Sequence, residues 1–241
     1  MTMTEPVTYE LDGRIAKITM DDGKVNALSI PMLKALHGAF DQAERDEAVV
    51  VLSGRESYFS AGFDLKVFSA GGDPIFEMLR LGATLTERVL SFPTPVVVAC
   101  NGHAIAAGSF LLLAADARIG VDGPFRMGLN EVKIGLVVPW FAVEVARQRL
   151  HPAHFDRAVV NATMYGPHEA VAAGFLDRVV GANDLKAASL EAAGELAELN
   201  PAAHAATKLR ARENALKLIR SAIETELYPQ DTGSVDAESS D

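Results

Sequence analysis

The chain has 241 residues, with 22 Lys and Arg against 32 Asp and Glu, so its formal net charge is −10. Hydrophobic residues make up 49% and charged residues 22%, which is typical of a soluble globular protein. The charge balance argues against a nucleic-acid-binding surface, which needs clustered cations, and no apolar run reaches the roughly 18 residues that span a membrane.

The first third of the chain predicts a β-hairpin followed by a helix. Residues 7–10 and 14–20 alternate between apolar and polar, and Asp12-Gly13 between them is typical of a hairpin turn. Ser29 then resembles an N-cap, with a proline two residues later in the first turn. Apolar residues follow at helical spacing, at Met32, Leu33, Leu36, Phe40 and Ala43.

Two short apolar runs, residues 49–52 and 95–100, are typical of strands that are covered on both faces. A helical pattern over residues 76–90 lies between them. This order predicts an α/β core with right-handed crossovers. The second run ends at Cys100, the only cysteine, so no intramolecular disulfide can form. Because no secretory signal is recognisable either, we expect a cytoplasmic protein.

From Pro139 onward the pattern is mostly helical. Helices are predicted over residues 140–150, 152–161, 168–173, 185–199 and 201–227, with one short strand at 176–180. We expect the aromatic pair Trp140 and Phe141 to anchor the core, with lining of an acyl pocket as the alternative. Residues 228–241 lack apolar periodicity and include four acidic side chains, which predicts a disordered acidic tail.

Two glycine-containing segments, FSAGFDL at 59–65 and NGHAIAAGSF at 101–110, follow the two apolar strands. Gly62 permits a backbone turn that is closed to other residues and can aim an N–H group outward. In the second segment, the start of the following helix offers unpaired N–H groups and a positive dipole end, which suit an oxyanion. A plain turn accounts for the first segment, and structural packing for the second, just as well.

A third segment, MGLNEVKIG at 127–135, places Glu131 among apolar residues. Desolvation there would raise the pKa of its carboxyl group toward the range that is useful for acid–base catalysis. A surface or helix-capping carboxylate is the alternative interpretation.

In this order and spacing, the three segments resemble the crotonase family, also called the enoyl-CoA hydratase/isomerase family. The resemblance runs from about residue 7 to 227 and takes in further matches at residues 25–28, 93–96, 101–102 and 166–177. It implies a spiral core of repeated β-β-α units over residues 1–138. It also implies a helical region over 139–227 that assembles the chain into a homotrimer or homohexamer.

The resemblance also implies a site for an acyl-CoA substrate. The backbone N–H groups of Phe63 and Ala107 would form an oxyanion hole that binds the thioester oxygen. Glu131 would be the catalytic residue. The positions that match the family's coenzyme and acyl contacts are Lys24, Ala27, Leu28, Ala61, Gly62, Asp64, Leu65, Lys66 and Phe110. Surface solvation explains the two lysines equally well. Coenzyme A belongs to the substrate, so no separate cofactor, metal or nucleic acid is expected.

Phe110 is a departure from the family's hydratases, which use two glutamates to activate water. One of these falls at Phe110, which can neither accept nor donate a proton, and the other is Glu131. A single carboxylate facing an oxyanion hole suits Δ3-Δ2-enoyl-CoA isomerisation in fatty-acid metabolism, and residues 128–131, GLNE, look closer to the family's isomerases. An atypical enoyl-CoA hydratase and a non-catalytic acyl-CoA-binding protein remain the alternatives.

Overall fold

A computed structural model describes residues 5–228, and its largest sheet has six strands in the order β1-β2-β4-β7-β9-β11. The strands are β1 (Val7–Asp12), β2 (Ile15–Met20), β4 (Val49–Ser53), β7 (Val96–Cys100), β9 (Ala117–Val121) and β11 (Arg178–Val180). Only the β1–β2 pair is antiparallel, and the other neighbours are parallel. The predicted hairpin and the two predicted apolar strands are thereby confirmed.

The chain repeats one β-β-α unit around this sheet. Each of β2, β4, β7 and β9 is followed by a short strand outside the large sheet and then by a helix. The short strands are β3 (Ala27–Leu28), β5 (Ser57–Ser60), β8 (Gly102–Ile105) and β10 (Met127–Gly128); β6 (Gly62–Phe63) pairs with β3. The helices include α1 (Ile30–Arg45), α3 (Asp73–Ser91) and α4 (Ala107–Ala114). The expected spiral of β-β-α units is therefore confirmed.

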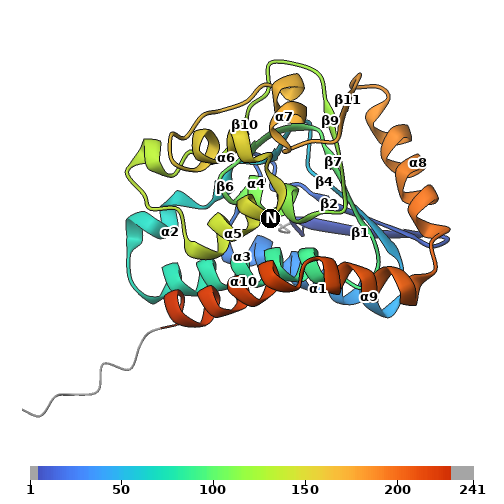
Figure 1. Cartoon of the computed structure of the whole chain (residues 1–241), viewed down its shortest axis with the longest axis horizontal. Coiled ribbons are helices and arrows are strands. Elements are labelled where there is room, and N and C mark those ends of the chain that lie inside the picture. The colour runs from blue at the N-terminus through green and yellow to red at the C-terminus, as the bar shows by residue number, and fades with distance from the viewer. Residues whose placement is uncertain (1–4, 229–241) are drawn as a thin grey trace, which may run out of the picture.

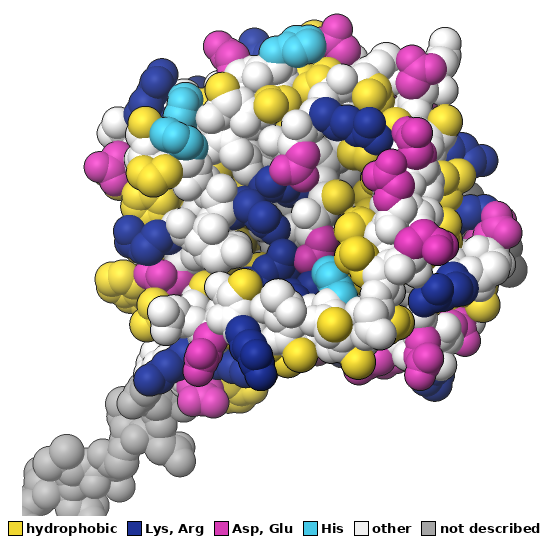
Figure 2. Space-filling model, turned by 45° about the vertical axis from the view of Figure 1, so that its right-hand side comes forward, with side chains coloured by type: hydrophobic (Ala, Val, Ile, Leu, Met, Phe, Trp, Pro, Cys, Tyr) yellow, Lys and Arg dark blue, Asp and Glu magenta, His cyan; other side chains and the backbone are white. Residues whose placement is uncertain are grey.

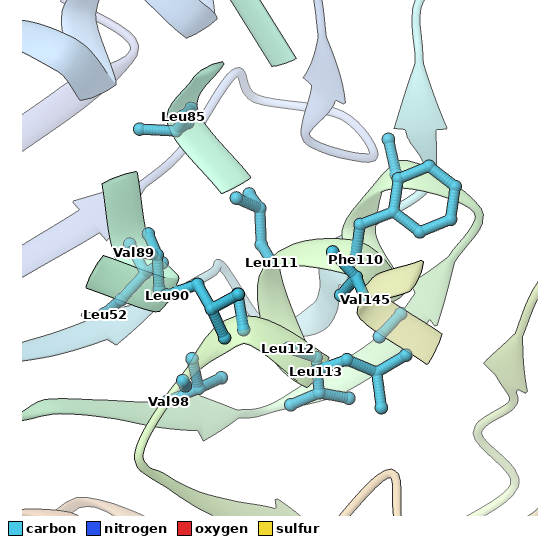
Figure 3. Packing of buried hydrophobic residues seen from close by; sticks show 14 of the residues in the cluster. Leu52, Leu85, Val89, Leu90, Val98, Phe110, Leu111, Leu112, Leu113 and Val145 are labelled. Carbon is cyan, nitrogen blue, oxygen red and sulfur yellow. The ribbon is translucent and has the colours of Figure 1, made fainter. Parts of the chain in front are cut away.

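The main core lies between the large sheet and helices α1, α3 and α4. Every residue of α4 is buried, and its leucines pack between side chains of α3 and of the strands β4 and β7 (Figure 3). Because β4 and β7 also face a second apolar cluster on the other side, under α8 (Leu185–Ala197), their buried positions on both faces are apolar.

The last third is helical as predicted, with two differences. Its helices are α5 (Trp140–Arg149), α6 (Pro152–Val159), α7 (Pro167–Ala173), α8, α9 (Pro201–Ala211) and α10 (Glu213–Glu226), and α10 runs beside α3 (Figure 1). The single helix predicted over 201–227 is two helices, because the backbone breaks at Arg212, whose side chain binds into the core. The core prediction for Trp140 is wrong: it is 64% exposed, and Phe141, one helical position on, takes the buried side.

Four buried or half-buried cations tie helix ends to the core. Figure 2 shows Lys and Arg side chains gathered in a hollow on one face of the molecule. The four cations donate to carbonyl oxygens at the C-terminal ends of α3, α4 and α7, where the helix dipole is negative. Two aspartates complete the network. Its members are Asp116, Arg118, Arg149, Asp177, Lys208 and Arg212.

Within residues 5–228, no helix combines the length and apolar character needed to cross a membrane. The predicted acidic tail falls, apart from Tyr228, outside the described residues. The assembly role predicted for the helical region stays a prediction.

Candidate active site

An apolar cavity of about 150 Å³ lies between the spiral core and the segment that leads into the helical region. Five of the residues singled out in the sequence line it: Ala61, Phe63, Leu65, Phe110 and Glu131. Eight further lining residues were not predicted: Phe68, Leu79, Ala106, Asn130, Ile134, Leu136, Val137 and Pro139. The three predicted segments therefore meet at one cavity.

Ala61 and Phe63 form one wall of the cavity, which we call the first wall. Asn26 holds this wall in place. It is fully buried, with a φ of 52° that Asn tolerates better than most residues, and its side-chain N–H₂ lies within hydrogen-bond distance of the carbonyl oxygens of Met20, Tyr58 and Phe59. The Ser60 hydroxyl donates to the Asn26 carbonyl at 2.7 Å. These bonds fix strand β3 beside β6, so that Ala27 lies opposite Gly62.

The two glycine-containing segments touch backbone to backbone. Gly62 has a φ of 91°, and a Cβ added there would lie 2.9 Å from the Ile105 oxygen and 3.3 Å from the Ala107 nitrogen. A Cβ on Gly108 would lie only 2.6 Å from the Ser60 oxygen. Glycine is thus required at both positions, and it brings the Phe63 strand against the start of α4.

The N-terminal end of α4 is anchored firmly at the cavity. Ala106, its N-cap, lines the cavity with a φ of 49°, a conformation that is strained for a residue with a side chain. Ser109 is fully buried; its hydroxyl donates to the carbonyl of Ala104 and accepts from the Gly128 N–H. Ser109 is therefore a structural link between α4, β8 and β10.

Glu131 also lines the cavity; it lies three residues after the end of β10 and is the N-cap of a short 3-10 helix, η1 (Val132–Ile134). Its side chain is buried, with 6% of the residue exposed, and its Oε2 atom has no hydrogen-bond partner among the described residues. Burial raises the pKa of the carboxyl group to about 7. A carboxyl group with this pKa exchanges a proton readily near neutral pH.

The family model for enoyl-CoA hydratase/isomerase matches residues 10–231 of this chain. The chain belongs to the enoyl-CoA hydratase/isomerase family. Among curated relatives, a carnitinyl-CoA dehydratase of Salmonella typhi is 31% identical over 209 residues, which cover 86% of this chain and 80% of that protein.

Solved structures of this family share the fold over nearly the whole chain. An enoyl-CoA isomerase of Mycobacterium tuberculosis is 44% identical, with a TM-score of 0.88 over 91% of this chain and 96% of its own. An enoyl-CoA hydratase of Mycobacterium marinum is 46% identical, with the same TM-score and coverage. Human mitochondrial Δ3-Δ2-enoyl-CoA isomerase is 25% identical, with a TM-score of 0.84 over 91% of each chain. These relatives establish the crotonase fold that the sequence predicted, and the family implies an acyl-CoA substrate.

Phe110 forms another part of the cavity wall. The ring is buried, lines the cavity and packs edge-to-face against Phe141, with centroids 5.6 Å apart (Figure 3 shows it beside Val145). Of the side chains that line the cavity, only Glu131 can ionise and only Asn130 is otherwise polar. The cavity thus offers a single proton-transfer group.

The remaining predicted contacts lie outside the cavity lining. Lys24 and Lys66 are exposed, and the Leu28 side chain is buried in the core. The Asp64 carboxylate caps α2 (Leu65–Ala70) by accepting from the Lys66 N–H. Ala27, Gly62 and Ala107 stand at the backbone junction behind the cavity. Their roles toward a coenzyme stay predictions. Within residues 5–228, no group of His, Cys, Asp and Glu is arranged to hold a metal ion.

Proposed function

We propose that this family member isomerises Δ3-enoyl-CoA thioesters to their conjugated Δ2 isomers. The observation that carries the proposal is the lone, desolvated Glu131 in an apolar cavity whose other wall is Phe110. Hydration across a double bond needs a positioned water and, in this family, a second carboxylate. An aromatic ring at that place excludes water, whereas a proton shuttle needs only one base.

In the proposed mechanism, the thioester oxygen accepts hydrogen bonds from the N–H groups of Phe63 and Ala107, at the positive end of α4. The ionised Glu131 carboxylate removes a proton from C2, and the electron pair moves onto the thioester oxygen as an enolate. The protonated Glu131 then returns the same proton at C4 while the enolate collapses. The double bond has moved from C3–C4 to C2–C3, and no atom has been gained or lost.

We also propose that the protein is a cytoplasmic enzyme of fatty-acid metabolism. We propose that it assembles as a homotrimer or homohexamer. The relatives include both isomerases and hydratases, so they support the acyl-CoA substrate without separating the two reactions. The residues of the cavity favour isomerisation.

The test is a direct assay with the purified chain and a 3-enoyl-CoA, following the ultraviolet absorbance of the conjugated thioester. We expect isomerisation at least a hundredfold faster than hydration of the matching 2-enoyl-CoA. Comparable rates for the two reactions would favour the hydratase. Tight binding of both substrates without turnover would favour the acyl-CoA-binding protein.

The rate should depend on pH through Glu131. A base acts only when it is deprotonated, and the pKa of this carboxyl group is raised to about 7. We therefore expect kcat/KM to rise about tenfold per pH unit below pH 7 and to level off above it. A profile measured from pH 5 to 9 checks this. A plateau that already begins at pH 5 would mean that a different group, or a solvated carboxylate, takes the proton.

A further inference from the structure

The cavity around Glu131 opens outward through a rim of four aliphatic side chains: Leu65, Ile134, Leu136 and Val137. Each of them lines the cavity and is also exposed to solvent, by 58%, 48%, 37% and 87% respectively. Apolar surface that is continuous from a binding cavity to the outside is unusual for a soluble protein and indicates a ligand that extends along it. We call these four residues the aliphatic rim.

The cavity is small. A cavity of about 150 Å³ lined by aliphatic and aromatic side chains holds a ligand about the size of benzene, or about six carbons. An acyl chain that is longer than this must leave the cavity. We propose that the substrates are enoyl-CoA thioesters of more than about eight acyl carbons, whose distal methylenes leave the cavity and lie on the aliphatic rim. This inference rests on the proposed function, because it requires an acyl-CoA with its thioester near Glu131.

Two separate segments supply the rim, on the same side of the molecule. Leu65 begins α2, the short helix that has no buried residue, and the other three side chains belong to the segment that follows Glu131 (Figure 1, left). Phe110 also lines the cavity but is buried, so it belongs to the side away from solvent. The exposed rim offers the tail of a long substrate a way out of the cavity.

Burying one methylene fully increases affinity about fourfold, so a methylene that is half covered on the rim should increase it about twofold. Between six and twelve carbons, affinity should therefore rise at least tenfold. Two series measure this: kcat/KM for 3-enoyl-CoAs of 6, 8, 10, 12 and 14 carbons, and Kd for hexanoyl-CoA and dodecanoyl-CoA. All are kept below the concentration at which micelles form. The Kd series does not depend on turnover.

The variant Val137→Asp places a charge at the most exposed part of the rim. We expect the ratio of affinities for dodecanoyl-CoA and hexanoyl-CoA to fall at least fivefold in this variant. Val160→Asp is the matched control, since Val160 is 57% exposed and does not line the cavity. Its ratio should equal that of the unmodified chain, and thermal unfolding of both variants confirms that they are folded.

Each outcome is decisive. A chain-length series that is flat, or that falls beyond six carbons, overturns the inference. So does a Val137→Asp variant that keeps its chain-length ratio but changes oligomeric mass, since the rim would then be a contact between copies of the chain. Absence of binding to any acyl-CoA rejects the proposed function itself. If Kd falls as the acyl chain lengthens but no 3-enoyl-CoA is turned over, isomerisation is rejected. Binding of the acyl chain to the aliphatic rim is then supported.

Discussion

Replacing Glu131 by glutamine should lower kcat for the isomerisation of a 3-enoyl-CoA by about 10²–10⁴-fold, the usual contribution of a positioned general base. Glutamine has nearly the same shape but cannot take the proton from C2. The KM should change little, because the apolar wall and the backbone N–H groups remain. Steady-state kinetics at pH 8, where the carboxyl group is mostly ionised, measure the effect. Unchanged isomerisation in Glu131→Gln would remove Glu131 from the mechanism.

The same variant should be more stable than the unmodified chain at pH 8. Burial raises the pKa of Glu131 from 4.5 to about 7, so the folded chain holds this proton more tightly than the unfolded chain does. The contribution of Glu131 to stability is therefore most favourable below pH 4.5 and is progressively lost as the pH rises through about 7. At 1.36 kcal/mol per pKa unit the full penalty is about 3 kcal/mol. We expect Glu131→Gln to increase the free energy of unfolding by about 1–3 kcal/mol, measured with urea at pH 8.

A matched control comes from a solvated carboxylate. Glu198 is exposed, and Glu198→Gln should change neither the rate nor the stability at pH 8. If Glu131→Gln lost activity and also became less stable, the lost rate would reflect a damaged fold rather than a missing base. The two measurements together therefore separate catalysis from structure.

The sequence predicted the elements whose signals are local. The all-apolar runs of β4 and β7 indicate strands that are buried on both faces, and the capped, amphipathic pattern of α1 indicates a helix on one face. In contrast, β3, β6 and β10 contain two residues each, too few for any periodicity, and they exist because their backbones pair with distant segments. The break at Arg212 likewise depends on tertiary partners of its side chain.

The candidate site could be predicted to the same extent. Gly62, Gly108 and Glu131 stand in short motifs whose chemistry is visible in the sequence, and the structure brings the three segments that contain them to one cavity. The role of Asn26 as the residue that fixes the first wall could be inferred only from its hydrogen bonds. Nothing in the sequence indicates that Leu136 and Val137 line the cavity. An aliphatic residue in a loop lines a cavity only because a distant element, here α2, lies beside it in the fold.

Asp116→Asn should destabilise the fold by about 3–5 kcal/mol, the typical cost of removing one partner from a buried ion network. The Asp116 carboxylate accepts from Lys208 at 2.6 Å, from Arg212 at 2.8 Å and from the Val96 N–H at 2.7 Å. Both cations are less than 9% exposed, so neither can turn to water when the negative charge is lost. Burial already lowers the pKa of Lys208, a tendency that Asp116 opposes.

At this chain length, such a loss should lower the melting temperature by about 10 °C, measurable by circular dichroism. Asp41→Asn is the matched control: Asp41 pairs with Arg88 at 2.6 Å, but its side chain is 55% exposed, so less than about 1 kcal/mol is expected. Equal effects in the two variants would mean that the stabilisation by the Asp116 network does not depend on its burial. A large effect at Asp116 alone would show that these cations are held by one carboxylate, which fixes α9 and the start of α10 against the end of α3.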